Sequence, residues 1–168
     1  KVYFPRALLV GAITVSLTIT MLIELAVLSG VLLAPGHVVF QWLPAVILVV
    51  ALQTLFVFGV AMLLSVVAVY FRDMEHLIGI LLQIWFYATP IIYPASQATD
   101  ALSDHPLLLW IYNANPMTRF AAIYRDLLYN LRGPELVDVL VVVGATAVSL
   151  AVGATVFRRL EPRLAEEL

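Results

Sequence analysis

The chain has 168 residues and a formal net charge of -2, and 63% of its residues are hydrophobic while only 12% are charged. A soluble domain carries about 25% charged residues, so this chain holds more apolar surface than a soluble core could hide, and we expect the excess to face lipid. The charge balance leaves no basic stripe for nucleic acid, and the lack of cysteine excludes disulfides and thiolate metal ligands.

Four apolar stretches have the length of a membrane span, which needs about 20 helical residues. They lie at about 7–33, 43–71, 77–94 and 136–157. The sequence therefore predicts an all-α polytopic membrane helix bundle in a single transmembrane domain. Glu24 is the only charged residue inside the first span. A carboxyl inside a membrane suggests a function, but a protonated carboxyl bonded to a neighbouring helix would explain Glu24 as well.

The turn between the second and third spans carries Arg72, Asp73, Glu75 and His76. These residues can be a topological anchor, with an arginine at the membrane surface and an acid at a helix N-terminus. Alternatively, they transmit movement from an ATPase or meet a pyrophosphate, for which Arg72 is a suitable fork-shaped donor.

Basic residues predict the orientation of the spans. Besides Arg72, they cluster at Lys1 and Arg6 and at Arg158, Arg159 and Arg163. Threading four spans in order brings all three clusters to one side, which the excess of positive charge marks as cytoplasmic. The segment 95–135 then falls outside although it contains Arg119, Arg125 and Arg132, so its positive charges need a separate explanation.

The third span ends in a proline pair, Pro90 and Pro94. Each proline removes a backbone donor, and the pair predicts a helix break near the external end. That break is either a simple helix end at the interface or a deformed mouth through which a bulky chain leaves. The polar residues 96–105 that follow are predicted to form an exposed loop.

Residues 106–132 predict a hairpin of two short helices before the last span. A short apolar run at 107–111 is followed by a turn signal at 113–116 and an amphipathic helix at 117–130. Neither helix is long enough to cross a bilayer. The hairpin therefore either re-enters the membrane, where protein or water must cover its turn, or lies flat on the outer surface.

Aromatic residues concentrate in the third span and the hairpin. The set consists of Trp85, Phe86, Tyr87, Tyr93, Trp110, Tyr112, Phe120 and Tyr124. Sugar rings stack on aromatic planes, so these side chains can line a carbohydrate path, although an interfacial aromatic belt has the same composition. The three histidines lie in separate loops without metal-ligand spacing, and the chain has no phosphate-binding G-x-x-x-x-G-K-[ST] motif. We therefore expect no metal site, no catalytic residue and no ATP binding by this chain.

Two segments resemble a known family. They are "VYFRDMEHLIGILLQIWFYATPIIYP" at 69–94 and "NPMTRFAAIYRDLLYN" at 115–130, and the opening "KVYFPRALL" and closing "RRLEPRLAEEL" are similar to the same family. The series resembles the membrane subunits of ABC-2 type exporters, in particular permeases for lipid-linked O-antigen, teichoic acid, capsule or galactan chains. The likeness covers the third to the sixth membrane helix of the family, which implies the C-terminal portion of a longer permease.

The resemblance also implies a mechanism. Two permeases would form a homodimer in the plasma (inner) membrane, and two separate nucleotide-binding subunits would bind ATP and Mg²⁺ and drive a type V ABC exporter. The hairpin would be a re-entrant gate, with Asn115, Pro116, Arg119, Arg125 and Asp126 as its principal residues.

Two other functions stay open. An ABC-2 exporter of drugs or small lipids would keep the fold with less aromatic lining. An intramembrane glycosyl or acyl transferase would need an external acid–base group, for which only Asp100, Asp104 and His105 are available.

Overall fold

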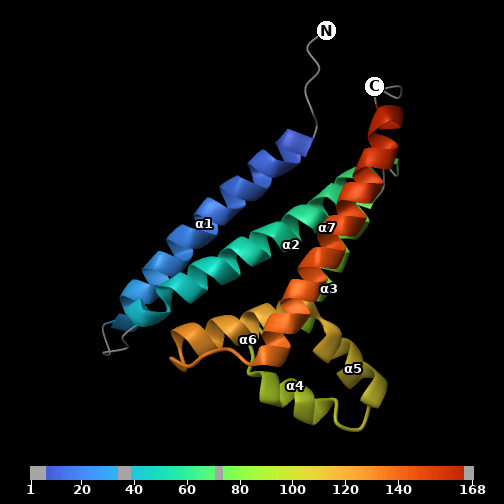
Figure 1. Cartoon of the computed structure of the whole chain (residues 1–168). Coiled ribbons are helices and arrows are strands. Elements are labelled where there is room, and N and C mark those ends of the chain that lie inside the picture. Colours follow the sequence, from blue (N-terminus) through green and yellow to red (C-terminus); the bar gives the residue numbers. More distant parts are fainter. Residues whose placement is uncertain (1–6, 34–38, 71–73, 165–168) are drawn as a thin grey trace.

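The computed structural model describes residues 7–33, 39–70 and 74–164, and all regular elements in them are helices (Figure 1). In chain order they are α1 (Ala7–Leu33), the 3-10 helix η1 (Val39–Trp42), α2 (Leu43–Tyr70), α3 (Met74–Ala88), α4 (Ala95–Ala101), α5 (Pro106–Ala114), α6 (Pro116–Leu128) and α7 (Leu136–Leu164). The predicted all-α helix bundle is therefore confirmed.

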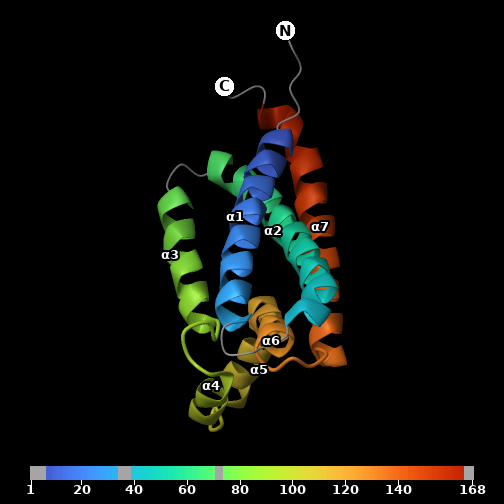
Figure 2. The same cartoon turned by 90° about the vertical axis from the view of Figure 1, so that its left-hand side faces the viewer.

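Three long helices, α1, α2 and α7, form the body of the molecule. The start of α1 and the ends of α2 and α7 lie at one end of this bundle, and α4, α5 and α6 lie at the other, which we call the hairpin end (Figures 1 and 2). Arg158 and Arg159 are exposed on α7 toward the opposite end. Lys1, Arg6, Arg72 and Asp73 lie outside the described residues.

The tightest contact joins α2 to α7 and depends on glycine. A Cβ on Gly153 would lie 2.1 Å from the carbonyl oxygen of Gly59, and a Cβ on Gly59 would lie 2.5 Å from the carbonyl carbon of Ser149. The Ser149 hydroxyl also donates a hydrogen bond of 3.2 Å to the carbonyl oxygen of Phe56. Small residues allow membrane helices to bring their backbones this close, and the close approach maximises van der Waals contact.

The core continues from this contact into α6. Phe120, Ile123 and Leu127 on α6 are 1%, 1% and 0% exposed, and they pack in one cluster with Phe56 of α2 and Val142 of α7. The apolar stripe predicted for the amphipathic helix is therefore the face that α6 buries. Because of this burial, α6 belongs to the folded core of the hairpin end.

Three of the described helices are long and apolar enough to cross a membrane, namely Ala7–Leu33, Val39–Val69 and Leu136–Leu160. The predicted third span, 77–94, ends early, because α3 stops at Ala88 and has only 15 residues. At about 1.5 Å per residue, α3 is about 22 Å long, shorter than the hydrocarbon core of about 30 Å. Its end precedes Pro90, which cannot donate the backbone hydrogen bond that a continued helix needs.

The prediction of an exposed loop at 96–105 is also partly wrong. Residues Ala95–Ala101 form the short helix α4, which has Pro94 as its N-cap. Proline is compatible with this position because an N-cap residue is extended, here with φ -69° and ψ 141°, and the ring fixes φ in that range. Pro106 and Pro116 instead occupy the first helical positions of α5 and α6, where the missing N–H would have no partner within the helix. The proline spacing thus defines where three helices of the hairpin end begin.

Candidate functional site

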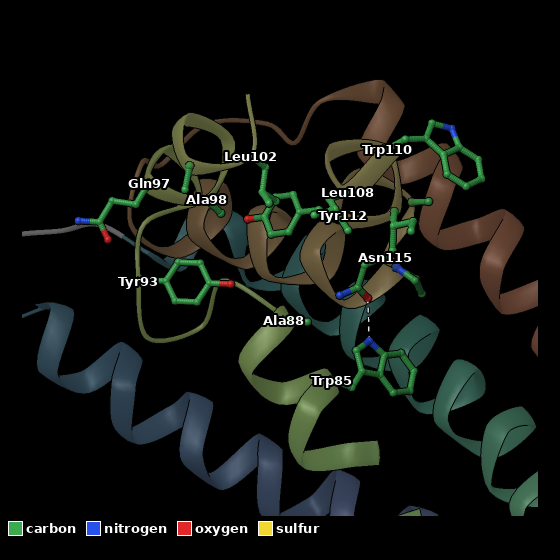
Figure 3. A pocket seen from close by; sticks show the side chains of 14 residues that line it. Trp85, Ala88, Tyr93, Gln97, Ala98, Leu102, Leu108, Trp110, Tyr112 and Asn115 are labelled. Atoms are coloured by element: carbon green, nitrogen blue, oxygen red, sulfur yellow. Dashed lines mark hydrogen bonds between the residues drawn. The ribbon is translucent and has the colours of Figure 1, made fainter. Parts of the chain in front are cut away.

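The candidate site is the junction between α3 and the hairpin, and Asn115 lies at its centre. The Asn115 side-chain oxygen accepts hydrogen bonds from the Trp85 indole nitrogen at 2.8 Å and from the Met117 amide at 3.0 Å. Its side-chain nitrogen donates to the Thr89 hydroxyl at 3.1 Å, and that hydroxyl donates to the Trp85 carbonyl at 2.8 Å. One amide therefore caps α6 and ties it to the end of α3 (Figure 3).

Arg125 makes a second tie between the same elements. Its guanidinium donates to the carbonyl oxygens of Pro90 and Tyr93, the latter at 3.1 Å, and it lies 3.4 Å from that of Ile91. These carbonyls belong to the stretch where the α3 helix is broken, so no helix bond uses them. Backbone carbonyls therefore hold the Arg125 guanidinium, and among the described residues it forms no ion pair with the neighbouring Asp126.

Arg119 connects the hairpin to α7. Its guanidinium donates to a carboxylate oxygen of Asp138 at 2.8 Å and to the Asn113 carbonyl at 3.0 Å. Asp138 is buried in the first turn of α7, where the helix dipole favours a negative charge. The ion pair therefore fixes the start of the last span against the turn of the hairpin.

Asp126 is buried, although the amphipathic pattern places it on the polar face of α6. Its carboxylate accepts hydrogen bonds from Asn130 and from Arg132, both at 2.8 Å. The bond from Asp126 raises the pKa of the exposed Arg132. All three arginines that depart from the charge rule thus have partners inside the hairpin end, which explains their presence on the predicted external side.

A cavity of about 740 Å³ opens beside this junction, between α3, α4 and α5. Among the predicted path residues, its wall includes Trp85, Tyr93, Trp110 and Tyr112, together with the turn residue Asn115 (Figure 3). The Tyr112 side chain is buried and its hydroxyl has no hydrogen-bond partner among the described residues, and burial raises its pKa. The Tyr93 hydroxyl donates to the Tyr87 carbonyl at 3.0 Å.

Other predicted site residues lie elsewhere. Phe120 does not line the cavity, because its ring is buried and lies 5.9 Å from the ring of Phe56. Tyr124 is half-buried, and burial raises its pKa. Phe86 and Tyr87 are exposed neighbours in edge-to-face contact. Glu24 is exposed on α1, far along the chain from the junction.

The cytoplasmic turn is described only in part. His76 is exposed in the first turn of α3, whereas Arg72, Asp73 and the side chain of Glu75 lie outside the described part of the chain. Within the described residues, no three histidine, aspartate or glutamate side chains form a group that could hold a metal ion.

Two residues of the junction are missing from the sequence-based set. Thr89 completes the contact of Asn115, and Asp138 pairs with Arg119 from 19 positions along the chain. The sequence could have indicated Asp138, because an acid at the start of an apolar span is expected to pair with a cation. The sequence does not indicate Thr89, since a threonine near a helix end is common and predicts no particular contact.

Membrane-length helices joined to a bonded hairpin define a multi-pass integral membrane protein. Residues 1–129 match the ABC-2 type transporter family, and the chain belongs to that family of plasma-membrane transporters. It is 28% identical over 173 residues to the O-antigen export system permease protein RfbA of Myxococcus xanthus, covering 100% of this chain and 63% of that relative. A Klebsiella pneumoniae protein of the same name is 30% identical over 129 residues, covering 76% of this chain and 47% of the relative. The chain thus spans about half to two thirds of these relatives' lengths.

Proposed function

We propose that this chain is the permease of an ATP-binding cassette exporter that moves a lipid-linked polysaccharide from the cytoplasm to the outer side of the plasma membrane. The names of the relatives support this substrate class, because they are O-antigen export system permeases. A second copy of the chain would complete the path. A separate nucleotide-binding subunit would bind ATP and Mg²⁺ and supply the energy.

The observation that carries the proposal is the aromatic cavity held beside the bonded hairpin. Trp85, Tyr93 and Trp110 offer ring faces on which successive sugars can stack without a requirement for one sugar sequence. Arg125 holds the broken stretch at Pro90 to Tyr93 against α6, so the hairpin forms one wall of an outer gate. The gate would close the path when no glycan passes.

The test replaces Arg125 by alanine in cells that depend on this chain. Removing the guanidinium leaves the carbonyls of the helix break without their donor, so we expect Arg125→Ala to reduce surface glycan at least tenfold while lipid-linked glycan accumulates inside. Both glycan pools are measured at equal membrane levels of the protein. Arg159→Ala, at an exposed position on α7, is the matched control and should export normally.

Two results would contradict the proposal. Normal surface glycan in Arg125→Ala cells would remove the gate from the mechanism. Loss of the whole chain without any internal glycan accumulating would exclude glycan as the cargo and would favour an exporter of drugs or small lipids.

A further inference from the structure

We propose that the junction between α3 and the hairpin binds the exported lipid-linked glycan at the point where its two parts meet. The hydrocarbon chain lies in an apolar cavity between α2 and α3, the sugars lie in the aromatic cavity, and the anionic group that links them meets Arg125. The inference rests on the proposed function for the class of cargo, and it adds where each part of that cargo binds.

The place for the chain is a second cavity, of about 310 Å³, beside the membrane-length part of α2. Its walls include Val60 and Ala61 of α2 and Leu82 of α3, and no charged residue of the described chain lines it. The polar side chains on its wall, Trp85 and Thr89, already bond within the protein. Because no polar side chain there is free to bind water or a polar ligand, the cavity suits a hydrocarbon chain.

Trp85 joins the two cavities. It lines both of them, and its bond to Asn115 fixes the indole below the turn of the hairpin (Figure 3). The broken stretch beyond α3 separates the cavities in the same way, because Thr89 and Ile91 line the apolar cavity whereas Tyr93 lines the aromatic one. A ligand that occupies both cavities is therefore apolar on one side of this boundary and suited to aromatic stacking on the other.

Arg125 brings a positive charge to the same boundary. Only its Nη2 atom takes part in the bonds to the carbonyls of the broken stretch, and among the described residues its Nε and Nη1 atoms have no hydrogen-bond partner. The side chain is half-buried, so the remaining N–H donors of the fork stay available. Parallel guanidinium donors match the oxygens of a phosphate group. The boundary thus carries the charge that an anionic link between lipid and sugar requires.

The two cavities together favour the exported conjugate over an ordinary membrane lipid. A membrane lipid would use the apolar cavity and the charge, but it would leave the aromatic cavity of about 740 Å³ without a matching group. The apolar cavity is at the lower end of the range of about 300–1,000 Å³ for small-molecule sites. It therefore takes the part of the chain next to the anionic group, and the rest of the chain stays in the bilayer.

The experiment compares the dissociation constants of synthetic probes for the permease with its nucleotide-binding subunit, in vesicles of neutral lipid. The full probe is a short isoprenoid phosphate that bears maltose, and further probes lack the isoprenoid chain, the phosphate or the sugar. We expect each omission to weaken binding to the unaltered protein at least tenfold, because each removes a group that the junction contacts.

Variants assign each part of the probe to its place. Ala61→Phe fills the apolar cavity, so removing the chain should cost it no further affinity, while removing the phosphate should still cost at least tenfold. Arg125→Ala should show the reverse pattern. Ala51→Phe, the same change at an exposed position of α2, is the matched control and should bind every probe like the unaltered protein. The chainless probe should bind Ala61→Phe as well as it binds the unaltered protein, which shows that the rest of the site is folded.

Loss of the chain that weakens binding to Ala61→Phe as much as to the unaltered protein would overturn the proposal. Equal binding of the probe without sugar would overturn it as well, because an ordinary membrane lipid would then fill the cavity. Binding is measured without export, so the two proposals fail separately. Cells that export no glycan, with these couplings present, would contradict the proposed function alone. Missing couplings in a protein that exports glycan normally would contradict this inference alone.

Discussion

At the scale of single residues, the hairpin end uses charge for structure. Arg119 is the clearest case, because its partner Asp138 has a side chain only 6% exposed while the arginine is 23% exposed. An acid buried to this extent needs a compensating charge, since transferring it from water without one is costly. The main effect of removing Arg119 would therefore be to leave the buried Asp138 carboxylate without a compensating charge.

We expect Arg119→Ala to lower the free energy of unfolding by about 2–3 kcal/mol, because it leaves Asp138 buried and unpaired. Asp138→Ala should cost about 1–2 kcal/mol, since Arg119 keeps its bond to the Asn113 carbonyl and some access to water. The double variant should be less destabilised than the sum of the two. Denaturant titration of the purified protein measures all three, and strict additivity would mean that the two side chains are not coupled.

At the scale of elements, the sequence predicted most of the helices and missed those whose signals are short. The apolar stripe of α6 was legible because Phe120, Ile123 and Leu127 follow helical spacing. The helix α4 was not, because its polar composition matches that of a turn. The pairing of Asn115 with Trp85 joins residues 30 positions apart, and no local pattern encodes such a contact.

Glycine at the contact between α2 and α7 gives a prediction of its own. Gly153→Ala should destabilise the protein by about 1–3 kcal/mol, because the new Cβ would overlap the Gly59 carbonyl. Gly144→Ala on the same helix is the matched control, since nothing lies within 4 Å of its added Cβ. Alanine there should be neutral or stabilising by about 0.5–1 kcal/mol, given its better helix propensity. Denaturant unfolding measures the free energy of unfolding of both variants. Equal losses of stability in the two would contradict the close contact between α2 and α7.

At the scale of the whole molecule, the arrangement of the helices bears on the orientation of the protein in the membrane. The hairpin end is predicted to lie outside and the end bearing Arg158 and Arg159 to lie in the cytoplasm. The partnered arginines of the hairpin no longer conflict with this orientation. Arginines that are paired within the protein indicate its internal contacts, and they are poor indicators of which side of the membrane they lie on.

A pair of single cysteines tests the orientation. Ser103→Cys should react with an impermeant thiol reagent in intact cells, because Ser103 is exposed in the turn after α4. Arg158→Cys should react only after the membrane is opened. The cysteine-free parent chain supplies the background. Reaction of Arg158→Cys in intact cells would reverse the orientation.

The contact between α2 and α7 also has a consequence for synthesis. Phe56 and Ser149, which meet across it, are 93 residues apart in the chain. A ribosome adding about 5–20 residues per second needs roughly 5–20 s to make that stretch, so α2 enters the membrane long before its main packing partner exists. A helix that waits alone in lipid must be tolerated there by itself, and no charged residue occurs between Leu43 and Tyr70. The uncharged sequence of α2 thus suits the interval of biogenesis as much as the finished bundle.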